Sequence, residues 1–244
     1  MKTISYIILS AHWRRLGAGS LCLILVGGCG SLGPAAAPQS PAFYALDNAR
    51  RAAPAADVVR HTLPTGAPTL VVSAPRAAAG FDSQHIIYVR QAHQLEYFAR
   101  SEWIDTPARM LSPLIVTAIE ESGAFGAVVL ASGSASGDLR LDTEVLQLQH
   151  EFGLRPSRVR FVLRASLVEG TSRRVIASRD FSAVVTAPSD DPYGGVVAAN
   201  QAVRTVLEEL AAYCTKTTAD WAPGRSEDHF RPAASRSKAA APTP

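Results

Sequence analysis

Three long segments in the second half of the chain alternate between apolar and polar positions. With few exceptions, every second residue is apolar in residues 139–145, 159–167 and 175–185. Between them stand charged residues, among them Arg140, Asp142, Glu144, Arg158, Arg160 and Arg164. A period of two indicates strands with one covered face, and turn residues at 155–157 and 169–172 separate the segments. We therefore predict a three-stranded antiparallel meander.

Two other stretches have helical periodicity. After Thr106 and Pro107, which suit a helix start, apolar residues recur every three or four positions until Gly123. A second apolar stripe extends over residues 193–213. Both stretches are expected to be amphipathic helices.

Short β-branched or aromatic runs indicate further strands at residues 69–74, 85–90, 94–99 and 125–131, the middle two close enough to form a hairpin. Together the elements predict an α+β domain. We expect a mostly antiparallel sheet of about six strands with both helices packed on one face.

The N-terminus has the pattern of an export signal. Arg14 and Arg15 precede an apolar run over residues 16–26, followed by two glycines and Cys29. This stretch resembles the lipobox of bacterial lipoproteins, which implies cleavage before Cys29 and lipid attachment to its sulfur. The alternative is that Cys29 is an ordinary residue of a signal helix or N-terminal anchor. Acyl chains would hold the chain on a membrane, at roughly 0.8 kcal/mol per buried methylene.

Four regions follow from these patterns. We expect a signal peptide at 1–28, a lipid-anchored tether rich in proline and alanine at 29–68, a folded domain at 69–214 and a disordered tail at 215–244. Within the tether, residues 43–46 are expected to pack back onto the domain.

Charge and apolar content exclude several classes. The chain has 24 basic and 21 acidic residues, but three of the basic ones, Lys2, Arg14 and Arg15, precede Cys29. The remaining 21 and 21 balance, so nucleic acid is not an expected partner. Beyond the N-terminus no stretch approaches the roughly 20 apolar residues of a spanning helix.

Motifs for catalysis are nearly absent, and we predict no enzyme, cofactor or metal site. Glycines 28, 30 and 33 match a dinucleotide fingerprint, but the expected cleavage falls inside it. His85, His93 and His150 are too far apart in sequence to indicate a metal site, and Cys214 is interpreted as a packing residue. A lipid-anchored hydrolase is a further alternative, against which the missing nucleophile motif counts.

Arg158, Arg160 and Arg164 form the candidate partner surface. If residue 144 lies opposite 164, Glu144 and Arg164 would pair across the strands, leaving Arg158 and Arg160 for an acidic partner or lipid headgroups. The alternative is a solvated strand face.

The motifs together resemble the ABC-type transport auxiliary lipoprotein family. They are the lipobox, Phe43, Tyr44 and Leu46, the segments 85–90 and 96–98, Trp103 and the helix start at 107–111. The resemblance implies a non-catalytic lipoprotein that faces the periplasm. Its implied partners are an MCE-domain protein and an inner-membrane ABC transporter, in the movement of phospholipid or other hydrophobic molecules between the two membranes. Only Cys29 carries over as a functional residue.

Three expectations depend on this setting. Gly30, where some bacteria use aspartate for inner-membrane retention, favours the outer membrane. A tethered domain of this kind can dock on a partner, hold the end of a tunnel at a membrane or assemble into a homo-oligomeric ring. The alternative function is an outer-membrane lipoprotein that activates a cell-wall synthase.

Overall fold

The computed structural model describes residues 40–47, 66–131, 136–153 and 155–221. The chain divides into two compact units, residues 1–40 and 41–244, and every element below belongs to the second. Its elements in chain order are β1 (Ala42–Tyr44), β2 (Thr69–Val72), β3 (Arg76–Ala77), β4 (His85–Val89), β5 (Glu96–Trp103), α2 (Pro107–Glu120), β6 (Ala127–Leu130), β7 (Leu139–Glu151), β8 (Arg158–Glu169), β9 (Val175–Thr186) and α3 (Pro192–Asp220). The α+β class is confirmed.

The predicted meander and hairpin are both present. β7, β8 and β9 pair antiparallel along almost their whole lengths. β4 and β5 also pair antiparallel, with an irregularity between His85 and Ile87. These pairs join strands that follow one another in the chain, which is why the sequence pattern alone predicted them.

The expectation of a mostly antiparallel sheet of about six strands is wrong. The described residues contain a mixed sheet of nine strands, in which β2, β3 and β4 lie along the same edge of β7, all parallel to it. Their partners on β7 are residues 139–141, 144–145 and 150–151 in turn. β6 is parallel to β2, and β1 is parallel to β5. Alternation along one strand does not encode the direction of a distant neighbour, so these pairs were not predictable.

A bulge in β7 divides its apolar pattern. The register against β8 shifts between Val145 and Gln147, so Leu146 has no partner there. Beyond the bulge the inward positions become Leu148 and His150, and the charged side chain of Glu151 lies on the outer face.

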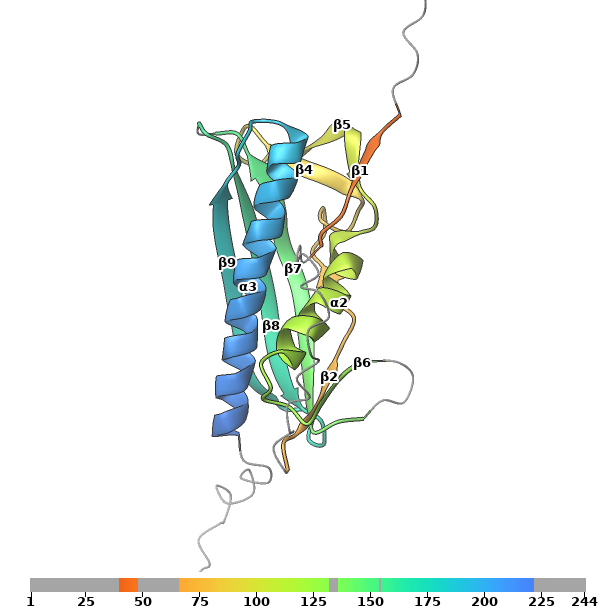
Figure 1. Cartoon of the computed structure of the whole chain (residues 1–244), viewed down its shortest axis with the longest axis vertical. Helices are drawn as coiled ribbons and strands as arrows, with labels where there is room; N and C mark the ends of the chain where they lie inside the picture. Colours follow the sequence, from red (N-terminus) through yellow and green to blue (C-terminus); the bar gives the residue numbers. More distant parts are fainter. Residues whose placement is uncertain (1–39, 48–65, 132–135, 154, 222–244) are drawn as a thin grey trace, which may run out of the picture. The chain divides into compact units, whose positions relative to one another are not determined.

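Both helices pack on the same face of the sheet, as predicted (Figure 1). The helix α2 begins at Pro107, and Asp191 caps α3 by accepting a hydrogen bond from the Gly194 N–H at 2.7 Å.

The helix α3 continues to Asp220, so residues 215–220, assigned to the tail from sequence, are helical. The indole of Trp221 packs against the core and donates to Glu169 at 3.2 Å, which holds the helix end in place. The rest of the expected tail lies outside the described residues.

In the described part of the chain, neither helix combines the length and the apolarity needed to cross a membrane.

Candidate functional site

Residues 43–46, which lie within the expected tether, pack back onto the folded domain as expected, and the ordered segment extends over residues 42–47. β1 pairs parallel with β5, and the carbonyl of Tyr44 accepts a hydrogen bond from the Ile104 N–H at 2.7 Å. Leu46 is buried in the core, whereas Phe43 is 59% exposed. One aromatic residue of the Phe-Tyr-x-Leu motif is thus left on the surface while its leucine fixes the chain in the core.

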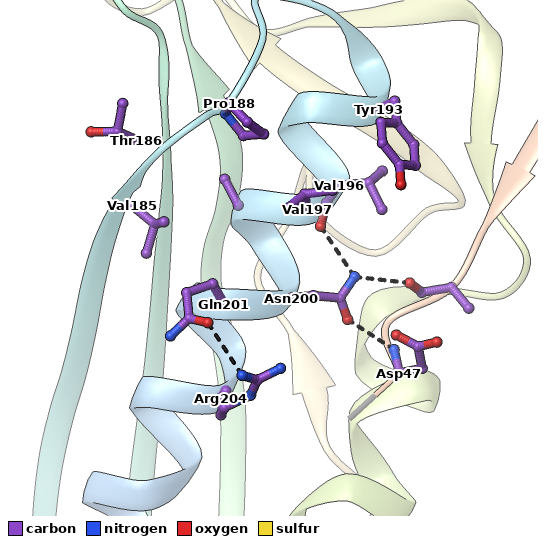
Figure 2. Close-up of a pocket in the computed structure, with 12 residues that line it drawn as sticks. Asp47, Val185, Thr186, Pro188, Tyr193, Val196, Val197, Asn200, Gln201 and Arg204 are labelled. Atoms are coloured by element: carbon purple, nitrogen blue, oxygen red, sulfur yellow. Dashed lines mark hydrogen bonds between the residues drawn. The ribbon is translucent and has the colours of Figure 1, made fainter. Parts of the chain in front are cut away.

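Asn200 of α3 fastens this segment from the other side, as Figure 2 shows. Its side-chain oxygen accepts from the Asp47 N–H at 2.9 Å, and its amide nitrogen donates to the carbonyls of Ala45 and Val196, both at 3.1 Å. We call this arrangement of Asn200 with residues 45–47 the clasp. It satisfies backbone groups of a segment that has left the sheet, and so joins this segment to α3.

A hollow of about 580 Å³ lies over the clasp and the first turns of α3. Aliphatic residues form much of its lining, among them Val197, which is 41% exposed, and the aromatic Tyr193, 64% exposed, lies beside them. Gln201 and Arg204 bond to each other beside it, at 3.3 Å. The hollow therefore offers apolar contact area bordered by polar groups, of which Asn200, Gln201 and Arg204 have partners.

The three predicted arginines lie on the outer face of β8, but they do not act as one group. Arg164 lies opposite Glu144 in the register, as expected, yet its two-pronged ion pair is with Asp180, at 2.7 and 2.9 Å. Arg158 and Arg160 were expected to be free. Instead each donates from its Nε to Glu151, at 2.9 and 2.7 Å.

Glu151 is the residue that sequence reasoning missed on this face. Burial acts to raise the pKa of Glu151, but hydrogen bonds from Arg160, Arg158 and Gln149 together hold it below its usual value. The carboxylate is therefore ionised at neutral pH and orients both guanidinium groups. The bulge at Leu146 put this residue on the outer face, so the simple alternation did not predict it.

A buried polar pair lies behind the start of α3. The Nε2 of His150 is 2.8 Å from the hydroxyl of Ser157, and its Nδ1 has no hydrogen-bond partner. Burial lowers the pKa of His150, against the opposing charges of Asp190 and Asp191. The imidazole is 2% exposed, so its role here is in packing.

The remaining candidate residues do not form a reactive group. Within the residues that the structure describes, no cluster of three or more histidine, cysteine or acidic side chains could hold a metal ion. Cys214 is fully buried in α3, and burial raises its thiol pKa to about 12. Cys29 lies outside the described residues.

Asn200 was also missed by sequence reasoning. It stands among the apolar positions 196, 203 and 207 of the α3 stripe, where a polar residue interrupts the pattern. That interruption was the one signal available, and nothing in it indicated a partner 153 residues away in the sequence.

Comparison with known proteins assigns the family. The model of the ABC-type transport auxiliary lipoprotein component matches residues 44–211, from the end of β1 into the second half of α3. The chain belongs to this family, whose name associates it with an ABC transport system. No curated protein matches.

Two solved structures have the same fold. A protein from Xanthomonas campestris is 26% identical, with a TM-score of 0.59, and the match covers 66% of this chain and 90% of that one. An uncharacterized protein is 14% identical, with a TM-score of 0.55, covering 72% of this chain and 99% of that one.

Proposed function

We propose that this chain is a non-catalytic, lipid-anchored auxiliary component of an MCE-type ABC transport system. In this role it stands in the periplasm, anchored through Cys29 to the outer membrane, and helps to move phospholipid or other hydrophobic molecules between the two membranes. The proposal rests on the family match and on the lipobox that ends at Cys29.

The clasp supports the anchored arrangement in this proposal. Asn200 bonds residues 45–47, which lie close behind the expected anchor in the sequence, into the domain. Residues 29–40 would then allow the domain to stand up to roughly 40 Å from the bilayer, at about 3.3 Å per residue. A domain held in this way could meet a partner at any distance from the membrane up to that limit.

Co-purification from native membranes tests the proposal. After crosslinking in cells, membranes would be solubilised in mild detergent and the full chain recovered through a C-terminal tag. We expect an MCE-domain protein and ABC transporter components in the wild-type sample. They should be lost with Cys29→Ala, which we expect to abolish membrane anchoring. Recovery of a cell-wall synthase, or of no partner, would contradict the proposal.

A further inference from the structure

Two guanidinium groups on the outer face of β8 share one carboxylate. Arg158 and Arg160 are two residues apart, so they project from the same face about 7 Å apart along the strand. Glu151, directly opposite Arg158 in β7, accepts from the Nε of both. The two arginine side chains are 38% and 32% exposed, so this group of three residues carries one unmatched positive charge at the surface.

Neighbouring strands do not cancel that charge. The register positions beside the two arginines are Thr186 and Val184 on β9 and Gln149 on β7, none of which is charged. Among the described residues, Arg158 is bonded through its Nε alone, and Arg160 adds a 3.5 Å contact from Nη2. The terminal nitrogens of Arg158 are therefore left to bind a second anion.

We propose that Arg158 and Arg160, oriented by Glu151, form a docking site for acidic side chains of a partner protein. A carboxylate of that partner bound to the free terminal nitrogens of Arg158 would balance the one unmatched positive charge. This proposal depends on the function proposed above in one respect: both require a protein partner.

The rest of the outer face favours a protein over a membrane surface. Arg140 pairs with Asp142 at 3.1 Å, Arg164 pairs with Asp180, and Glu144 opposite Arg164 adds an acidic group, so the other outward arginines of β7 and β8 are matched. Attraction to anionic lipid grows with the number of unmatched basic residues, at about 1 kcal/mol each, and one such charge is a weak anchor. Guanidinium groups fixed on a strand suit directed contacts to carboxylates instead.

Site-specific crosslinking in cells tests the site. A photoreactive residue would replace Val184, which is 44% exposed and lies opposite Arg160, in the full-length chain. We expect a protein adduct whose crosslinked peptide contains aspartate or glutamate. Its yield should fall at least about tenfold in R158Q/R160Q, because charge-assisted bonds are lost. The matched control, R140Q, removes a one-to-one pair from the same face and should keep the wild-type yield.

A second variant distinguishes loss of the docking site from loss of folding. R158Q/R160Q leaves the half-buried Glu151 with its hydrogen bond from Gln149 but without a cationic partner. E151Q/R158Q/R160Q removes all three charges together and should lose the adduct equally. Unchanged yield in either variant, a phospholipid adduct or no adduct at Val184 would overturn the docking site. The identity of the captured protein tests the transport function separately. If the adduct depends on the two arginines but its protein belongs to no transport system, the docking site stands and the proposed transport function is contradicted.

Discussion

The backbone N–H of Asp47 donates a hydrogen bond to the side-chain oxygen of Asn200 at 2.9 Å, across 153 residues of sequence. This bond joins the end of the Phe-Tyr-x-Leu motif to the long helix that covers the sheet. The same amide also donates to Ala45, so a single side chain fixes both ends of this short segment.

Removing the clasp should destabilise the domain without unfolding it. We expect Asn200→Ala to lower the free energy of unfolding by about 1–2 kcal/mol, because three hydrogen bonds are lost from a partly exposed site. Chemical denaturation would measure the change. Gln201→Ala, at the next and more exposed helix position, should change stability by less than about 0.5 kcal/mol. Equal effects of the two variants would show that the clasp contributes nothing.

Gly195 is required because the His150 ring packs against it. A Cβ at Gly195 would lie 2.5 Å from the Nδ1 of His150 and 3.0 Å from its Cε1, and the ring is buried and bonded to Ser157. Gly195→Ala should therefore destabilise by about 1–3 kcal/mol, despite the better helix propensity of alanine. At Gly153 an added Cβ meets no atom within 4 Å. Thermal unfolding should show Gly153→Ala close to wild type, and a stable Gly195→Ala would contradict the packing argument.

His150 should make the domain less stable in mild acid. Burial lowers its pKa in the folded state, against the charges of Asp190 and Asp191, so above about pH 6.5 the residue is neutral in both states and contributes no pH dependence. Below that pH the unfolded chain binds a proton that the folded domain does not. The free energy of unfolding then falls by up to about 1.4 kcal/mol per pH unit, until the folded pKa is reached.

The measurement compares wild type with His150→Gln. Denaturation at about pH 7.5 and about pH 5.5 should show a smaller loss of stability in the variant, because the carboxylates are common to both chains. Identical pH profiles for wild type and His150→Gln would exclude this linkage.

The thiol of Cys214 should be inert in the folded protein. Burial raises its pKa to about 12, and the residue has no exposed surface. Iodoacetamide at mildly alkaline pH should leave it unmodified until denaturant is added, as measured by intact mass. Rapid modification under native conditions would show that α3 opens locally.

Much of the architecture could be predicted from local pattern. Alternation identified β7, β8 and β9 and their antiparallel order, because short turns join them. Periodicity also identified both helices, since an apolar stripe must face a core. The motifs from the lipobox through Trp103 to the helix start at Pro107 were sufficient to indicate the family.

Long-range pairing was decided by the tertiary structure. Nothing along β2, β3 or β4 shows that each lies parallel to β7, because strand direction depends on how distant segments dock. The choice of ion-pair partner has the same origin. Arg164 pairs with Asp180 rather than with Glu144, and Glu151 pairs with both Arg158 and Arg160. Each arginine bonds to the better-placed carboxylate, and the packing of neighbouring strands decides which carboxylate that is. The sequence by itself determined the meander, the hairpin, both helices and the family. The clasp and the charge pairing exist only where the folded chain brings remote residues within bonding distance.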